Sequence, residues 1–270
     1  MHTSSTLPVL FVSHGSPMFA LEQGHTGPAL RAWAQALPTQ PTGIVIMSPH
    51  WMARSPVVMT NPTPPTWHDF GGFPEPLYQL QYPAKGDPAL GQQVMGLLQA
   101  AGITTQGDAQ RPLDHGAWVP LMHLFPQADI PVVQVALPAN YTPASLMAMG
   151  AALQSLRGEG VLIIGSGSMT HNLGEFMQGR PELAAPPAPY VGEFSRWIES
   201  KVTQADTQAM LHYRSQAPHA VRAHPTDEHF ATIYFALGAG GWGKDAAVKT
   251  RYLSREVMYS ILAMDAFALS

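Results

Sequence analysis

The sequence predicts an α/β protein, a three-layer α/β/α sandwich around a mostly parallel or mixed central sheet. Its apolar runs are continuous, which is typical of strands that are covered on both faces. Segments with helical periodicity lie between these runs, and strands that alternate with helices build such layered folds. A length of 270 residues and a hydrophobic fraction of 46% are enough for one large core, so we expect a single domain over residues 1–270.

Four apolar runs are the predicted strands, at residues 8–13, 43–48, 131–136 and 161–168. Three of these runs lead into a histidine, namely His14, His50 and His171. Ligands in open α/β sheets bind beyond the carboxyl ends of the strands. We therefore expect these three side chains at one edge of the sheet.

Two helices between the strands are predicted from their capping residues. Asp87 and Pro88 suit the N-cap and first turn of one helix, and Gly102 suits its C-terminal end. A Thr-Pro pair at 142–143 opens the other helix, which is expected to run to Gly158 with apolar residues on one side.

Two further segments are predicted loops. Residues 61–83 are rich in proline, glycine and aromatic residues, and we expect them to form an ordered loop over the site. Residues 181–189 have the proline and alanine content of a surface loop or partner contact.

The charge pattern excludes several classes of partner. A net charge of -4 and the lack of any run of Lys or Arg argue against a nucleic-acid groove or an anionic membrane surface, so a small substrate is favoured. The sequence has neither a signal peptide nor a run of about 20 apolar residues, and we expect a cytoplasmic protein. No feature of the sequence indicates an oligomeric state.

Histidines are the candidate metal ligands, because a chain with no cysteine must hold any metal by His, Asp or Glu. Gly15 after His14 lets the backbone turn sharply and leaves the imidazole facing a cleft. Together with His50, this would deliver two neutral imidazoles from adjacent strand ends, which suits a divalent metal of intermediate softness. His171 is a candidate for a further ligand or for a general base.

Two more histidines have an acidic neighbour in the sequence: His115 follows Asp114, and His68 precedes Asp69. Both are candidate site residues, with structural hydrogen bonds in a loop as the alternative. An anion-binding turn is the alternative for the Gly-Ser-Gly stretch at 165–167, although this stretch lacks the lysine of a P-loop. The histidines without a comparable context are His2, His25, His123, His212 and His219. The motifs of zincin peptidases and of serine hydrolases are absent from the sequence.

Several short motifs, taken in order along the chain, resemble the class III extradiol ring-cleaving dioxygenases, and within them the 4,5-DOPA dioxygenase branch. These motifs are Ser13-His14-Gly15-Ser16-Pro17-Met18, Pro49-His50-Trp51, residues 66–74, Tyr82-Pro83-Ala84, residues 113–118, Gly165-Ser166-Gly167, His171-Asn172-Leu173 and His229. The resemblance implies a mononuclear site in which His14, His50 and His229 hold Fe(II), with Zn(II) possible in the same site. His171 would be a fourth ligand or the base.

The resemblance also implies a catechol substrate and O₂, with ring cleavage beside the diol and His115 as a hydrogen-bonding partner of the substrate or of oxygen. Aromatic residues are candidate walls for the substrate ring: Trp51, Phe70, Phe73 and Trp118. Two alternatives use the same histidines, a zinc-dependent hydrolase and a non-catalytic metal-binding protein.

The third ligand of the resemblance lies in a predicted helix over residues 226–237, with Thr226 as its N-cap. At about 100° per residue, Glu228 is expected to point nearly opposite the apolar face, whereas His229 lies at the edge of that face. We therefore expect His229, and not Glu228, to face the site.

Overall fold

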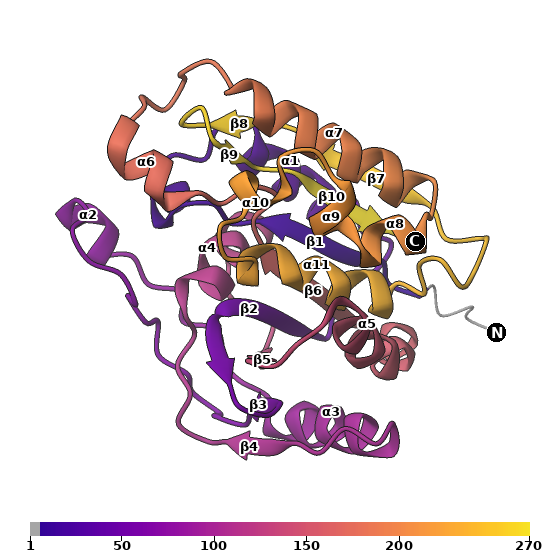
Figure 1. Ribbon diagram of the computed structural model, residues 1–270. Helices are drawn as coiled ribbons and strands as arrows, with labels where there is room; N and C mark the ends of the chain where they lie inside the picture. The colour runs from indigo at the N-terminus through magenta and orange to yellow at the C-terminus, as the bar shows by residue number, and fades with distance from the viewer. Residues whose placement is uncertain (1–5) are drawn as a thin grey trace.

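An eight-stranded mixed sheet forms the middle layer of the computed structural model, which describes residues 6–270 (Figure 1). The strand order is β4-β3-β5-β2-β6-β1-β10-β7. These strands are β1 (Val9–Ser13), β2 (Gly43–Ala53), β3 (Val57–Met59), β4 (Gln106–Asp108), β5 (Val132–Pro138), β6 (Val161–Gly167), β7 (Thr250–Ser254) and β10 (Ala266–Leu269). A separate two-stranded sheet pairs β8 (Val257–Met258) with β9 (Leu262–Ala263).

The four strands at the centre of the sheet, β5, β2, β6 and β1, are parallel to one another. Antiparallel pairing appears outside them, between β3 and β5 on one side and from β1 to β10 to β7 on the other. All residues of β1, β5 and β6 are buried, as expected for strands that are covered on both faces. The predicted α/β/α sandwich with a mixed sheet is confirmed.

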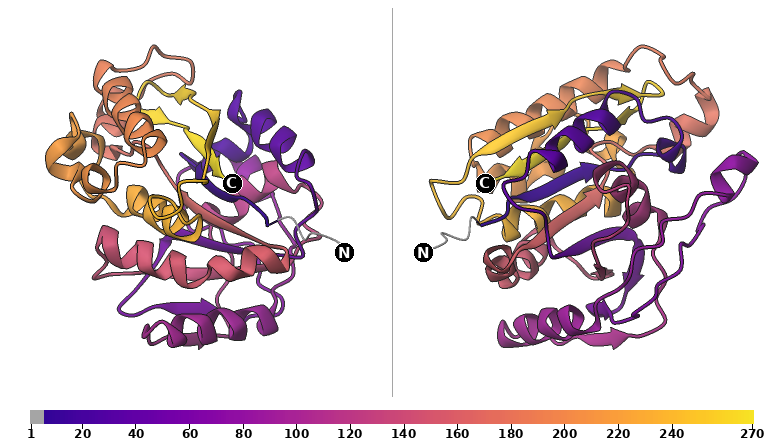
Figure 2. Two further views of the ribbon diagram at one scale, coloured as in Figure 1. Left: turned by 90° about the vertical axis from the view of Figure 1, so that its right-hand side faces the viewer. Right: turned by 180° about the vertical axis from the view of Figure 1, so that it is seen from behind.

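Helices cover both faces of this sheet (Figure 2). One side carries α5 (Pro143–Ala152) and α11 (Glu228–Ala239), and the other carries α1 (Thr26–Gln35) and α4 (His115–Leu124). The remaining helical segments are η1 (Pro17–Ala20), α2 (Glu75–Tyr78), α3 (Pro88–Ala100), η2 (Gln154–Glu159), α6 (Leu173–Gly179), α7 (Pro189–Thr203), α8 (Thr207–Leu211), α9 (Tyr213–Gln216) and α10 (Ala220–Ala223). No helix in residues 6–270 is both long enough and apolar enough to cross a membrane.

Helix α11 lies unusually close to β6, because glycines remove the side chains between them. A Cβ atom at Gly165 would lie 2.3 Å from the carbonyl oxygen of Thr232, and one at Gly167 would lie 2.0 Å from that of His229. Ser166 faces the opposite side of the sheet, where its Oγ donates to the carbonyl oxygen of Gly116 in α4. Residues 165–167 therefore belong to a strand, and the anion-binding turn considered as their alternative is wrong.

The predicted helix starts are confirmed, but one helix is shorter than expected. Asp87 caps α3 by accepting a hydrogen bond from the Leu90 amide, and Thr142 caps α5 in a capping box. Helix α5 ends at Ala152 instead of near Gly158, and the chain continues as the 3₁₀ segment η2. The tighter winding of η2 is typical of a helix end and keeps its apolar residues buried.

Strand β2 is longer than the predicted run 43–48, since it continues to Ala53. Its pairing with β5 shifts between Ser48 and Met52, so His50 lies in an irregularity within the strand and not beyond its end. Such bulges bend a strand and redirect side chains. This correction explains how a histidine inside β2 reaches the end of the parallel sheet.

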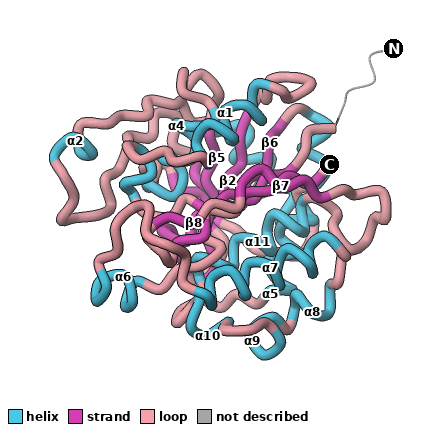
Figure 3. The backbone as a smooth tube through the Cα atoms, turned by 90° about the horizontal axis from the view of Figure 1, so that it is seen from above, coloured by secondary structure: helices cyan, strands magenta, loops and turns pink. Residues whose placement is uncertain are grey.

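The predicted loops lie at the surface of the fold. Within residues 61–83 the only helical segment is α2, and residues 181–188 form a loop that ends where α7 begins at Pro189. Seen from above, α2 and α6 both lie at the same end of the molecule (Figure 3). These two segments flank the site described next.

Candidate metal centre

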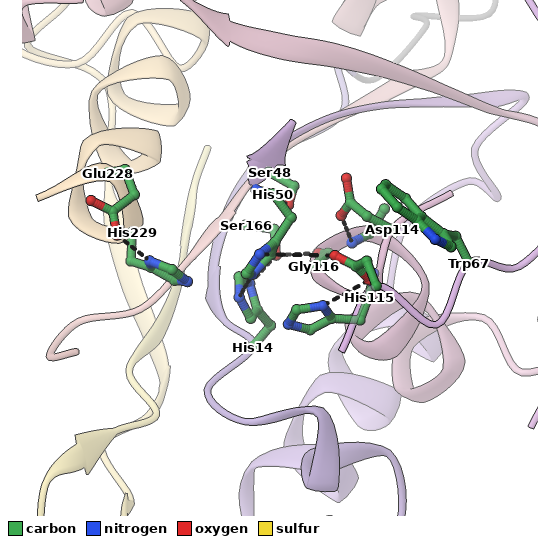
Figure 4. A network of polar contacts seen from close by, with 12 residues as sticks. His14, Ser48, His50, Trp67, Asp114, His115, Gly116, Ser166, Glu228 and His229 are labelled. Carbon is green, nitrogen blue, oxygen red and sulfur yellow. Dashed lines mark hydrogen bonds and ion pairs between the residues drawn. The ribbon is translucent and has the colours of Figure 1, made fainter. Parts of the chain in front are cut away.

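Two histidines meet at the end of β1 and at the irregularity within β2. His14 follows β1 directly, its amide donates to the carbonyl oxygen of Gly167, and Gly15 turns the chain with a φ of 59°. The Nε2 atom of His14 lies 3.1 Å from Nε2 of His50 (Figure 4). Two nitrogens that each bind one ion at about 2.1 Å lie roughly 3.0–3.4 Å apart. The spacing therefore suits two ligands of one metal ion.

His229 completes this group from the first turn of α11. Its ring centroid lies 5.5 Å from that of His14 and 4.9 Å from that of His50. One nitrogen from each of the three rings falls within 4.8 Å of the others. The Nε2 atom of His229 is buried and has no hydrogen-bond partner among residues 6–270. A buried polar atom without a partner is costly unless something else binds it, and a metal ion fits this position.

Hydrogen bonds on the far side of two rings fix which nitrogen carries the proton. Ser166 gives its only hydroxyl proton to Gly116, so its Oγ must accept from Nδ1 of His14 at 3.0 Å. Nδ1 of His229 donates to the Glu228 carboxylate, also at 3.0 Å. In both rings Nε2 is thus unprotonated and presents a lone pair to the centre, as ligating histidines do.

His171 lies next to His229 and apart from the other two rings. The two rings are stacked with centroids 3.6 Å apart and an interplanar angle of 11°. His171 forms a candidate ligand group with Glu228 and His229, but not with His14 and His50. Its backbone amide donates to the Ala223 carbonyl oxygen, which fixes the chain after β6. The sequence placed this histidine at the correct edge of the sheet, and the geometry puts it at the margin of the three-histidine group.

His115 is held by an aspartate that is remote in the sequence. Asp69 Oδ1 accepts from both the backbone amide and Nδ1 of His115, at 2.9 and 3.0 Å, and its Oδ2 lies 3.9 Å from Nδ1 of His50. The neighbouring aspartate, Asp114, instead caps α4 and pairs with Arg111. The carboxylate that contacts His115 is thus not its neighbour in the sequence.

His68 has a structural role in this arrangement. Its Nε2 bonds to the carbonyl oxygen of Leu80 across the loop, at 3.0 Å, and it makes no hydrogen bond with the adjacent Asp69 in the described structure. Since His68 does not line the cavity at the centre, the structural alternative holds for this residue.

Burial keeps the central imidazoles neutral. It lowers the pKa of His50 to about 3 and that of His171 to about 4, with further lowering by neighbouring imidazoles. The pKa values of His14 and His229 are also lowered well below the ordinary value, again mainly by burial. Burial alone would raise the pKa of Asp69, but hydrogen bonds from His115 outweigh it and the net direction is down. At neutral pH the histidines therefore carry free lone pairs.

The helix that carries His229 differs from the prediction in two details. Helix α11 starts at Glu228 with Asp227 at the N-cap position, and Thr226 is not the cap. Its hydroxyl donates to Glu228 instead. Glu228 does not point away from the site, because its long side chain turns back to His229. The orientation predicted from the helical repeat was correct for His229. It was wrong for Glu228, because the repeat does not restrict the long side chain of the first residue of a helix.

A cavity of about 310 Å³ opens onto the histidines and is lined by His50, His115, His171 and His229. Phe70 and Phe73 also line it, as expected. Two other predicted walls lie elsewhere. The ring of Trp51 stacks under Arg111, and Trp118 is fully buried with its indole N–H donating to Trp67.

Sequence reasoning missed the groups that orient the rings: Ser166, Glu228 and the pairing of Asp69 with His115. Asp69 carried a detectable signal, since a carboxylate in a loop that covers the site is a natural partner for a histidine. Ser166 carried none, because a serine inside an apolar run looks like an ordinary strand residue.

Comparison with known proteins decides the family. Residues 8–264 match the family described as the catalytic LigB subunit of aromatic ring-opening dioxygenase. The chain belongs to this LigB family. A 4,5-DOPA dioxygenase extradiol from Beta vulgaris is 38% identical over 234 residues, which are 86% of each protein. A protein of the same name from Escherichia coli K12 is 35% identical over 240 residues, covering 88% of this chain and 86% of that one.

A solved structure agrees with this assignment. The crystal structure of an uncharacterized protein from Escherichia coli K12 superposes with a TM-score of 0.78 and 27% identity, over 98% of this chain and 100% of that one. The resemblance indicated by the motifs is confirmed, and this LigB-family chain is an extradiol ring-cleaving dioxygenase, an oxidoreductase. LigB dioxygenases depend on a metal, and the histidine group described above is the candidate site for it.

Proposed function

We propose that the protein opens the ring of a catechol beside its two hydroxyl groups, with O₂, at one Fe(II) ion held by His14, His50 and His229. The observation that carries the proposal is the convergence of three buried imidazoles, one of which has a buried Nε2 atom with no partner in residues 6–270. Zn(II) is accommodated by the same donors, because imidazole suits both metals.

Iron bound here would supply the Lewis-acid and redox chemistry of the reaction. The three rings would hold it with their orientation fixed from behind, by Ser166 for His14 and by Glu228 for His229. Such partners raise ligand basicity and hold the ring in place. The chain thus offers a preorganised set of neutral nitrogen donors.

His171 is the proposed base that takes a proton from a catechol hydroxyl. It lines the cavity, and its ring is stacked on His229, so it lies beside the proposed metal position without belonging to the three-histidine group. Its pKa of about 4 keeps the imidazole unprotonated at neutral pH, as a base requires.

His115 is proposed to hydrogen-bond the substrate or oxygen. It lines the same cavity, and Asp69 engages its Nδ1, which leaves Nε2 as the free nitrogen. Phe70 and Phe73 are proposed to contact the substrate ring, because an aromatic ring packs well against aromatic walls. The names of the relatives support a catechol as the substrate class.

Oxygen uptake tests the proposed function. The protein, stripped of metal and loaded anaerobically with Fe(II), is mixed with a panel of catechols in an oxygen-electrode cell. We expect O₂ consumption together with a yellow ring-opened product, and neither from the Zn(II)-loaded protein with the same substrates. An Fe(II) protein that consumes no O₂ with any catechol of the panel would overturn the proposal.

A further inference from the structure

The cavity at the histidines is apolar apart from the histidines themselves and Ser16. No Lys, Arg, Asp or Glu side chain is among the residues that line it. Its apolar side chains come from the loop before α2, from α6 and from the start of β9, and they include Phe70, Phe73, Leu173, Phe176, Met177 and Leu262. Ser16 caps η1 by accepting a hydrogen bond from the Met18 amide, and its hydroxyl carries no charge.

Helix α6 gives the mouth of the cavity an exposed apolar face. Leu173, Phe176 and Met177 are spaced three and four residues apart, so they share one side of the helix. Leu173 is 55% exposed and Met177 is 61% exposed, which is unusual for large apolar side chains. Exposed apolar groups beside a cavity commonly mark a surface that binds a ligand.

Two arginines, Arg111 and Arg222, already have carboxylate partners. Arg111 pairs with Asp114 at 2.6 Å and lies between the rings of Trp51 and Trp67, at 4.6 and 5.1 Å from their centroids. Arg111 is also not among the residues that line the cavity.

Arg222 is similarly engaged. It pairs with Glu175 at 2.7 Å and lies over the ring of Tyr190. The carboxylates closest to the histidines, Asp69 and Glu228, accept hydrogen bonds from imidazoles. A substrate carboxylate would therefore meet no cationic side chain among the described residues that line the cavity, and a charge without a partner is less favourable against apolar side chains than an apolar group is.

We propose that the preferred substrate is a catechol whose ring substituent is neutral and apolar, in contrast to the charged amino-acid side chain of DOPA. The inference rests on the proposed function and specifies its substrate class. The catechol hydroxyls face the histidines, and the substituent lies against Leu173, Phe176 and Met177. Each methylene buried there raises kcat/KM by roughly three- to fourfold, as expected for transfer of apolar surface out of water.

A matched pair of substrates tests this proposal. The compounds 4-propylcatechol and 3-(3,4-dihydroxyphenyl)propionate have side chains of similar size that differ in charge, and 4-methylcatechol and L-DOPA complete the panel. With the Fe(II) protein we expect kcat/KM for 4-propylcatechol to exceed that for the propionate and for L-DOPA by at least about tenfold. Equal or higher values for either charged substrate would overturn the proposal.

Calorimetric titration of the anaerobic Fe(II) protein with the same compounds gives a second readout that needs no turnover. We expect the same order of affinities. If no catechol is cleaved, the proposed function fails. The order of the binding affinities still tests whether the cavity prefers an apolar or a charged substituent. A propionate that binds as tightly as 4-propylcatechol contradicts the present inference alone.

A positive charge introduced at the mouth of the cavity tests where the ring substituent of the substrate lies. Met177→Arg is expected to reduce the preference for 4-propylcatechol over the propionate by at least about fivefold, because the carboxylate gains a partner. Val221→Arg adds the same charge at an exposed residue outside the cavity lining. An equal shift in both variants, or in neither, would show that α6 does not contact the substituent. Circular dichroism and thermal midpoints confirm that both variants fold.

Discussion

The two sides of the cavity are built in opposite ways. On one side, His14 and His50 emerge from the buried parallel strands, and their nitrogens meet at 3.1 Å. On the other side, α2 and α6 are short, and α6 contains no buried residue. The difference teaches that the proposed metal ligands are positioned by the sheet, where close packing allows little movement. The residues that contact the substrate substituent lie instead in surface segments.

Removal of a histidine from the sheet side should have the largest effect. His14→Ala or His50→Ala deletes one of the three proposed ligands, and we expect most of the bound metal to be lost while the fold survives. Elemental analysis of protein loaded with Fe(II) measures this. His212→Ala removes an exposed histidine outside the group and should keep full metal. Full metal content in the His14 or His50 variant would show that the sheet side does not hold the ion.

Replacement of His171 should reduce turnover without loss of the bound metal. If it is the base, His171→Ala loses turnover by roughly 10²–10⁴-fold, as for other general acid–base groups, and retains Fe(II). Single-turnover kinetics and elemental analysis on the same sample give both values. Loss of metal together with turnover would place His171 among the ligands and extend the three-histidine group to four.

Substitution of Glu228 should affect metal binding and activity less than substitution of His229, whose ring it orients. Glu228→Gln keeps an acceptor for Nδ1 of His229, so we expect metal and activity to persist, whereas His229→Ala should lose both. Glu228→Ala removes the acceptor, and its metal affinity should fall by roughly 10–100-fold. Competition with a chelator measures that affinity. A Gln variant as weak as the Ala variant would mean that the negative charge, and not the hydrogen bond, is what matters.

In the metal-free protein, acid should lower the free energy of unfolding, and this is the smallest of the expected effects. The folded state holds His171 and the core residue His224 at pKa values of about 4, below the unfolded value of 6.5. Between these values the unfolded chain binds more protons, so the free energy of unfolding should decrease as pH falls from about 6.5 to about 4. Urea unfolding at several pH values measures this. Stability that stays constant over this range would contradict the neutral burial of these rings.

The sequence predicted the parallel core and the histidines at its edge because continuous apolar runs and the residues after them are local features. It did not predict the antiparallel strands β7 and β10, whose pairing partners are remote. For the same reason the sequence could not identify the partner of His115: His115 binds Asp69 across 46 positions, while the adjacent Asp114 caps α4. The bulge that redirects His50 depends on pairing with β5, which no local pattern encodes.

The position of β1 in the sheet has a consequence for the order of events during synthesis. This strand, which leads to His14, pairs with β6 and with β10, and both partners follow it by more than 140 residues. His229 likewise follows most of the chain. Chains emerge from the ribosome N-terminus first, so β1 must wait for partners that are made much later. The three-histidine group would therefore form only after His229 has emerged, and the proposed iron ion would bind after that point.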